Sequence, residues 1–420
     1  MAHIAIHKSP EAYAVLPFFI TAGIFFLLFS FLLVFSGGQL FGHHFQPKVL
    51  AIVHSLALGW GTMVIYGAAY QLVPVIFERS LRSSKLAFFS YILLTSGTCV
   101  LIYSFWYFKI GLLMCVGGLL ITLSSYLYFY LLWMTTKDVE HLFELRLYFT
   151  FSAFWLCFTT TLGLLLAINL AHGFLTKSHL DILKLHAHVG IVGWFLQLIL
   201  GAGAKMLPMF LLGQSTKTKW LYVSVILINL GLVLFLLDGY SHPVGLRSLT
   251  FGAIVLLGVV CWAVFVVDCF VHRARKVLDI PMKHSFISFL SLLFAFLTLP
   301  MVVRQESGNW VNLYAVWVFF GWITGIILGM TYKTLPFMIW NWRYKDLNGI
   351  KKIPLPKELY SQRLLSIQYY LYLVALVVMA VAVAGQFRWA LYCAAWLWAA
   401  LAAVYVVNVG KVVFHQRKSK

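Results

Sequence analysis

Charged residues are scarce in this sequence, and acidic residues are the scarcest of them. Only 10% of the 420 residues are Asp, Glu, Lys or Arg, and only 12 are acidic, whereas 62% are hydrophobic. A soluble domain carries roughly a quarter charged residues, so no soluble domain is expected in this chain. The composition is typical of a polytopic membrane protein.

Long polar stretches are also missing, and apolar runs follow one another along nearly the whole chain. A helix needs about 20 mostly apolar residues to cross about 30 Å of hydrocarbon. Twelve runs reach this length, which predicts an all-α fold in one integral membrane domain. The predicted spans are 14–37, 49–77, 86–108, 110–134, 146–170, 183–212, 219–239, 247–271, 285–303, 309–340, 364–385 and 389–410.

Paired cysteines are absent as well. None of the six cysteines lies in a Cys-x-x-Cys motif, and all six fall inside predicted spans. They are expected to be small, buried apolar residues, so neither a disulfide framework nor a thiolate metal site is predicted.

The shortage of acidic residues leaves a formal net charge of +19. Twelve spans place both termini on one side of the membrane, and most of the 31 lysines and arginines fall in the termini and loops of that side. The positive-inside rule then predicts that both termini lie in the cytoplasm. The lipid bilayer is the expected partner of this charge, and no nucleic-acid partner is expected.

One stretch of the sequence occurs three times, at 54–74, 188–208 and 316–336. Each copy holds a Gly-Trp pair, a second glycine seven residues after the tryptophan, and a proline seven residues further on. The copies fall on the second, sixth and tenth predicted spans, so each repeat comprises four spans. The three pseudo-symmetric repeats are expected at about 14–134, 146–271 and 285–410.

The third copy lacks the histidine that the first two share. His54 and His188 stand six residues before the repeated tryptophan, where the third copy has Val316. An imidazole in hydrocarbon is costly unless it has a partner, so both residues are candidates for a function. They could ligate a haem or metal at a shared centre, or they could form hydrogen bonds between helices. His186 points about 200° away from His188 on a regular helix, so these two side chains are not expected to bind the same ion.

Residues that follow the histidines in the sequence also have two interpretations. Gly59, Gly190 and Gly193 leave room for a flat macrocycle or allow close helix packing. The tryptophans Trp60 and Trp194 could stack on a cofactor, although packing between helices is the favoured interpretation.

Two further sets of polar residues lie near the ends of the spans. Lys205 and Lys333 precede the repeated proline at the cytoplasmic end and are expected to extend to the lipid headgroups. Several histidines, among them His43 and His44, lie in outer loops. They are expected to be solvated, and a copper or zinc site made from them is the alternative.

The pattern His186-Ala187-His188, followed by Pro208, resembles a motif of subunit I of the haem–copper oxidase superfamily, and His54 resembles its low-spin haem ligand. The resemblance implies twelve spans in three four-helix arcs, as in cytochrome c oxidase subunit I. The chain departs from that family because it lacks the copper-binding His-His pair, the His-x-x-x-Tyr motif, and a His-x-His on the tenth span. A dinuclear centre of the known kind is therefore not expected.

The resemblance implies a divergent, oxidase-like membrane protein that carries a b-type haem (heme b). The expected axial ligands are His54 and either His188 or His186. Electron transport, or binding or reduction of a diatomic gas such as nitric oxide, is the expected role, with a cytochrome or quinol as possible redox partner. If the protein is an enzyme, it is expected to be an oxidoreductase that is not a proton-pumping oxygen reductase. The alternatives are a copper-handling membrane protein and a non-catalytic subunit of a respiratory complex.

Overall fold

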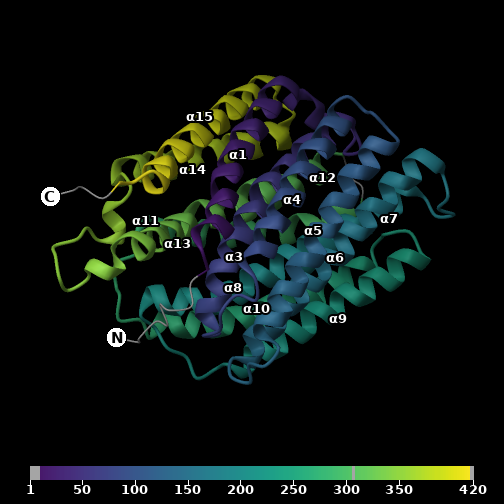
Figure 1. The fold of residues 1–420 in the computed structure, drawn as a ribbon. Coiled ribbons are helices and arrows are strands. Elements are labelled where there is room, and N and C mark those ends of the chain that lie inside the picture. The colour runs from purple at the N-terminus through teal and green to yellow at the C-terminus, as the bar shows by residue number, and fades with distance from the viewer. Residues whose placement is uncertain (1–9, 305–307, 417–420) are drawn as a thin grey trace.

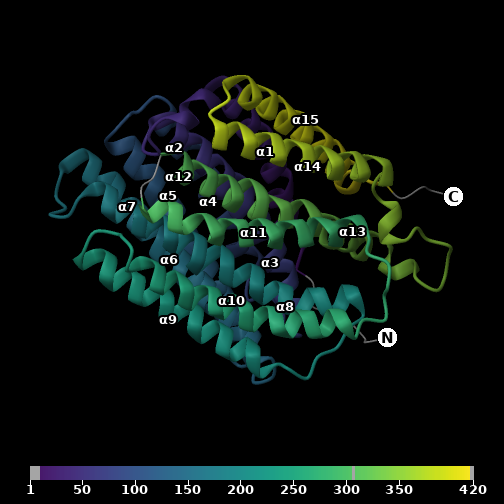
Figure 2. The same ribbon diagram turned by 180° about the vertical axis from the view of Figure 1, so that it is seen from behind.

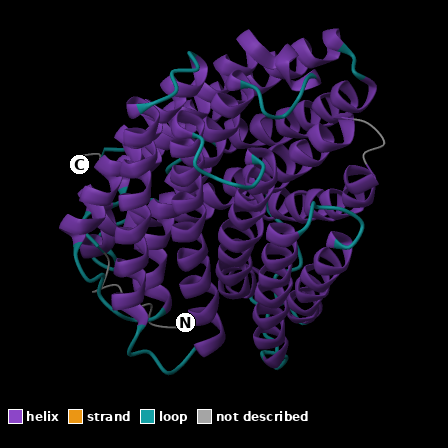
Figure 3. Cartoon of the chain, turned by 90° about the vertical axis from the view of Figure 1, so that its right-hand side faces the viewer, coloured by secondary structure: helices purple, strands orange, loops and turns teal. Residues whose placement is uncertain are grey.

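The structure is a computed structural model that describes residues 10–304 and 308–416. The described residues contain twelve helices long and apolar enough to cross a membrane, and no strand (Figure 3). The predicted all-α fold with twelve spans is confirmed. The spans are Ala12–Phe41, Pro47–Ile76, Ser84–Trp106, Leu112–Thr136, Phe143–His172, His179–Leu211, Lys219–Ser241, Ser248–Val271, Ile280–Arg304, Gly308–Leu347, Gln362–Gly385 and Arg388–Val413.

Eight spans are single α-helices. These are α4 (Ser84–Trp106), α5 (Leu112–Thr136), α6 (Phe143–His172), α9 (Lys219–Ser241), α10 (Ser248–Val271), α11 (Ile280–Arg304), α14 (Gln362–Gly385) and α15 (Arg388–Val413). The first span consists of α1 (Leu16–Ser36) between the short 3₁₀ helices η2 (Ala12–Ala14) and η3 (Gly37–Phe41).

The second, sixth and tenth spans, which carry the sequence repeat, each change helix type in the middle. The second runs through α2 (Pro47–His54), the π-helix η4 (Ser55–Thr62) and α3 (Met63–Ile76). The sixth runs through α7 (His179–His188), the π-helix η5 (Val189–Leu196) and α8 (Gln197–Leu211). The tenth runs through α12 (Gly308–Ala315), the π-helix η6 (Val316–Ile323), α13 (Thr324–Tyr344) and the 3₁₀ helix η7 (Lys345–Leu347).

These three composite spans are the most deeply buried of the twelve and meet at the centre of the bundle. Each packs against the span that precedes it in the chain and against the antiparallel helix pair that follows it. Figures 1 and 2 show the pairs α9–α10 and α14–α15 at opposite edges of the bundle. This arrangement repeats three times around the centre, in line with the threefold sequence pattern.

The junctions between repeats are not equivalent. Helices α5 and α6 pack closely, as do α15 and α1, but α10 and α11 touch at only a few places. Two junctions are therefore closed by direct contact of their outer helices, whereas the junction between the second and third repeats is loose.

The chain enters and leaves the bundle at the same end (Figure 1). The long connection that holds η8 (Pro356–Glu358) lies at this end as well, and the loop between α6 and α7 lies at the other. The two ends are called the termini end and the outer end below.

Candidate functional site

His54 and His188 have the same local geometry, as their places in the repeat predict. Each is the last residue of an α-helical segment, and a π-helix begins at the next residue. The Nδ1 atom of His54 lies 2.8 Å from the carbonyl oxygen of Leu50, and that of His188 lies 2.8 Å from the carbonyl oxygen of Lys184. Because a carbonyl only accepts, both rings carry their proton on Nδ1, and Nε2 is left as the acceptor or ligand atom.

The third repeat has the π-helix of the other two but lacks their histidine. In the third copy η6 begins at Val316, the counterpart of the two histidines, which is one residue earlier in the repeat than η4 and η5 begin. The π-helix is present without the histidine, so it belongs to the scaffold. Such segments are uncommon and frequently mark functional sites.

Both histidines pack against aromatic side chains, and His188 also contacts the neighbouring repeat. His188 lies between Phe235 of α9 and Tyr314 of α12, with ring centroids 5.1 and 6.1 Å away. His54 packs against Phe105 of α4, with ring centroids 4.8 Å apart. In the repeat alignment, Tyr314 and His186 both stand two residues before the histidine position. His186 and Tyr314 therefore occupy equivalent places in the repeat, and Tyr314 contacts His188 across a junction between repeats.

His186 faces away from His188, as the helix geometry predicts. Its Nδ1 lies 3.0 Å from the carbonyl oxygen of Thr159, and its ring covers Gly163 of the same helix, α6. His186 thus packs against α6 of its own repeat, whereas His188 is turned toward Tyr314 of the third repeat.

A cavity of about 670 Å³ occupies the loose junction between the second and third repeats. Its walls come from α7, η5, α9, α10, α11, α12 and η6, and most of the side chains are aliphatic or aromatic. His188 and Tyr314 line it, while His43, His44 and Lys184 line its outer end. Neither His54 nor His186 belongs to the lining, so the structure does not bring His54 and His188 into one cavity.

Small residues keep this cavity open. Ala187 and Ala295 lie in its wall, and a Cβ atom added to Gly252 would meet nothing closer than a methyl group of Leu299 at 3.9 Å. A longer side chain at Gly252 would therefore extend into the space.

The glycines of the repeat itself serve packing. A Cβ atom on Gly59 would lie 2.5 Å from the Phe25 ring, and one on Gly193 would lie 2.6 Å from Cβ of Trp155. Gly190 likewise faces Thr159 at 3.2 Å. Of the two interpretations of these glycines, close helix packing is the one that the structure supports.

The tryptophans Trp60 and Trp194 are fully buried outside the cavity. Trp60 stacks on Phe26 with a centroid distance of 4.2 Å, and Nε1 of Trp194 donates to Oγ1 of Thr62 over 3.1 Å. Neither lines the cavity, whereas their counterpart in the third repeat, Trp322, does. Contact of Trp60 or Trp194 with a cofactor stays a prediction, and their packing role is visible.

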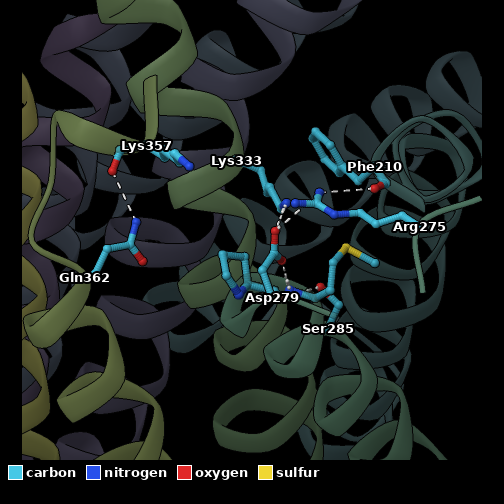
Figure 4. A network of polar contacts seen from close by, with 9 residues as sticks. Phe210, Arg275, Asp279, Ser285, Lys333, Lys357 and Gln362 are labelled. Atoms are coloured by element: carbon cyan, nitrogen blue, oxygen red, sulfur yellow. Dashed lines mark hydrogen bonds and ion pairs between the residues drawn. The ribbon is translucent and has the colours of Figure 1, made fainter. Parts of the chain in front are cut away.

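A second polar cluster lies at the termini end (Figure 4). Lys333 of α13 forms an ion pair with Asp279, which also faces Arg275 at 3.5 Å, and the Arg275 guanidinium reaches the carbonyl of Phe210. The Lys333 side chain is only 11% exposed. The expectation that Lys333 extends to the headgroups is therefore wrong. The carboxylate of Asp279, in the loop before α11, binds its ammonium group inside the protein.

Sequence reasoning overlooked three features, two at the cavity and one on α11. Tyr314 has no motif around it, and its place beside His188 could have been found only by extending the repeat alignment two residues upstream. His43 is exposed, as expected for an outer-loop histidine, but the sequence did not show that His43 and His44 border a cavity. His284 was not singled out, although it is fully buried and neither ring nitrogen has a hydrogen-bond partner among the described residues.

Within residues 10–304 and 308–416, no three His, Cys, Asp or Glu side chains are grouped so that they could hold a metal ion. Copper binding by the outer histidines therefore stays a prediction. No protein-family model matches the chain, and no curated protein matches it significantly. The resemblance to the haem–copper oxidase superfamily thus depends on the sequence motifs and the twelve-span architecture alone.

Proposed function

We propose that the cavity at the junction of the second and third repeats binds a b-type haem, with His188 as its axial ligand. The observation that carries this proposal is one imidazole on the wall of a large apolar cavity, with Nδ1 held by a backbone carbonyl. That hydrogen bond orients the ring and leaves Nε2 for a metal, which is the arrangement second-shell partners give to ligating histidines. Neutral imidazole is a common haem ligand.

The size and chemistry of the cavity fit such a group. Ligand pockets in proteins measure about 300–1,000 Å³ and are mostly apolar, with a few placed polar groups. The cavity of about 670 Å³ lies within that range, and its polar groups are concentrated at the outer end. A porphyrin has the same division, with an apolar ring and two propionates at one edge.

A single histidine at depth favours gas binding over a haem with two histidine ligands. His54 does not line the cavity, so it is not placed to supply a second ligand there. A bound haem would supply an iron centre that can bind a diatomic gas such as nitric oxide. Tyr314 lines the same space, and its hydroxyl group has no hydrogen-bond partner among the described residues, so it can donate to a ligand beside His188.

The proposal extends to placement in the cell. We infer a multi-pass protein of the bacterial inner membrane with both termini in the cytoplasm, because most lysines and arginines lie at the termini end. If the haem turns over a substrate, the protein is an oxidoreductase, and a cytochrome or quinol would be its electron donor.

The test is the visible spectrum of the purified protein, before and after addition of haem. A Soret band and a reduced-minus-oxidised difference spectrum are expected for the wild type, and His188→Ala should lose both. His54→Ala is the matched control, because it removes the equivalent imidazole from the first repeat, and it should keep the spectrum. Absence of a Soret band in the haem-supplemented wild type, or an unchanged band in His188→Ala, would refute the proposal. Loss of the band in folded His54→Ala would instead support ligation by both histidines.

A further inference from the structure

The outer end of the cavity is covered by a segment from a distant part of the fold. Residues 42–46, which connect η3 to α2, belong to the first repeat, yet two of them line the cavity between the second and third repeats. The side-chain amide of Asn312 on α12 donates to the carbonyl of Leu40, and the Phe45 ring lies 5.1 Å from that of His179 on α7. Thus η3 contacts α12, and the connection that follows it contacts α7.

This segment brings two imidazoles to the rim. The rings of His43 and His44 stack with a centroid distance of 4.2 Å. The Nδ1 atom of His43 accepts a hydrogen bond from the backbone N–H of Phe45 over 3.1 Å, so the ring proton of neutral His43 is on Nε2, which can donate. Lys184 adds an ammonium group from α7.

The rim carries basic side chains, and one of them, Lys184, already has an acidic partner. Asp181 binds Lys184 over 3.0 Å, but no aspartate or glutamate occurs among the described residues that line the cavity. Burial lowers the pKa of His44 below its usual value, and the neighbouring His43 and Lys184 act in the same direction. A bound anion would reverse this effect, because it favours the protonated imidazole.

We propose that His43, His44 and Lys184 form a binding site for the carboxylate of a ligand whose apolar body fills the cavity. The proposal rests in part on the proposed function, because a haem has an apolar ring and two carboxylates, its propionates. A fatty acid has it as well, so the site does not depend on haem alone. Charge-assisted hydrogen bonds to a carboxylate are short and about twice as strong as neutral ones.

The experiment compares acids with their uncharged esters. The purified full-length protein is titrated with protohaem and with protohaem dimethyl ester, and separately, without haem, with oleate and methyl oleate. The variants are His43→Ala/His44→Ala and the control His172→Ala/His242→Ala, which removes two outer-loop histidines that do not line the cavity. Wild type and control should bind each acid on the order of tenfold more tightly than its ester. The His43→Ala/His44→Ala variant should lose most of this preference and keep its affinity for the esters.

The outcomes separate this site from the proposed function. If neither acid is preferred over its ester by the wild type, or if the preference survives in His43→Ala/His44→Ala, the carboxylate site is refuted. If protohaem does not bind at all but oleate is preferred over methyl oleate, the carboxylate site stands and the haem proposal fails. Thermal unfolding of each variant reports whether the fold is retained.

Discussion

Thr62 and Thr324 occupy the same place in two repeats, yet only one of them has a hydrogen-bond partner. Oγ1 of Thr62 accepts from Trp194, whereas Oγ1 of Thr324 is buried without a partner among the described residues. In the membrane, a hydrogen bond between helices contributes about 0.6–1.7 kcal/mol. Thr62→Val should therefore lower the free energy of unfolding by about 1 kcal/mol, because it leaves the indole N–H unsatisfied. Thr324→Val should be neutral or stabilising, and an equal loss in both variants in a thermal unfolding assay in detergent would contradict the assignment.

His284 is a second residue that can be compared with its counterparts in the other two repeats. Gly329 faces His284 as Gly67 faces Phe18 and Gly201 faces Tyr148, so the three side chains fill one place in the repeat. The ring nitrogens of His284 have no partner among the described residues. His284→Phe should raise the free energy of unfolding by about 1 kcal/mol, because an unsatisfied buried polar group is removed.

Tyr148→Phe is the matched contrast to His284→Phe. The Tyr148 hydroxyl donates to Oγ of Ser224 over 2.6 Å, so its removal should lower stability by about the same amount. The two substitutions therefore have opposite predicted signs at equivalent places, and denaturation midpoints measured in one detergent compare them directly. A loss of stability in His284→Phe would indicate that the imidazole binds a group in the protein.

The lowered pKa of His44 predicts a pH dependence. The pKa of His44 is lower in the folded protein than in the unfolded chain, so the unfolded chain binds more protons as the pH falls below about 6.5. The stability contributed by neutral His44 is complete above that pH and is lost as the pH falls through it. His44→Gln should therefore lose less thermal stability than the wild type between pH 7.5 and 5.5. The exposed His172, changed to Gln, is the control and should leave the wild-type slope unchanged.

Single residues also show where the sequence was sufficient. The depth of His54 and His188 and their equivalent surroundings follow from the alignment of the repeats, and the structure agrees. The place of Lys333 did not follow, because a lysine near the end of a span has the same pattern whether it extends to headgroups or meets Asp279. Only the fold of the loop before α11 brings that carboxylate to it.

At the scale of elements, the ion pair of Lys333 and Asp279 joins α13 to the start of α11. Asp279 also accepts a hydrogen bond from the backbone N–H of Met282 and so caps α11. Asn can keep such a cap, so Asp279→Asn tests the charge alone. The substitution should cost about 1–3 kcal/mol, less than for a fully buried pair, because the Asp279 side chain is 32% exposed.

The matching experiment removes both charges. The double variant Asp279→Asn/Lys333→Met should recover most of the stability lost in Asp279→Asn, because no uncompensated ammonium group is left inside the protein. Lys205→Met is the control, since Lys205 has the equivalent place in the second repeat but no ion pair among the described residues. It should change stability by no more than about 0.5 kcal/mol. Additive losses in the double variant would contradict the pair.

The boundaries of the helices could be predicted from apolar length, but their internal changes could not. The segments η4, η5 and η6 are mostly apolar, and a run of eight such residues fits a π-helix as well as an α-helix. The Gly-Trp pair marks the position of the π-helix only once three copies are seen together in the structure.

At the scale of the whole molecule, the charge distribution predicts the orientation in the membrane. Fusion of a fluorescent protein after the C-terminus should give fluorescence, because that end is expected in the cytoplasm. Alkaline phosphatase, which is active only outside the cytoplasm, should be inactive at the C-terminus and active when inserted near Ser241 at the outer end. The reverse pattern of activities would contradict the predicted topology.

The cavity could not be predicted at any level of the sequence. Its existence depends on how closely α10 approaches α11, and the apolar residues of its wall do not differ in type from those of the closed junctions. Only the small side chains Ala187, Gly252 and Ala295 hint at open space, and small residues are common wherever membrane helices pack.

The loose contact between α10 and α11 has a consequence for counting ligands. A bundle of three similar repeats could have a cavity at each of its three junctions. Two of these junctions are closed by contact of their outer helices, and one is not. Saturation should therefore be reached at one large ligand per chain. Substituting smaller side chains at the α5–α6 or the α15–α1 junction would test whether a second ligand can bind there.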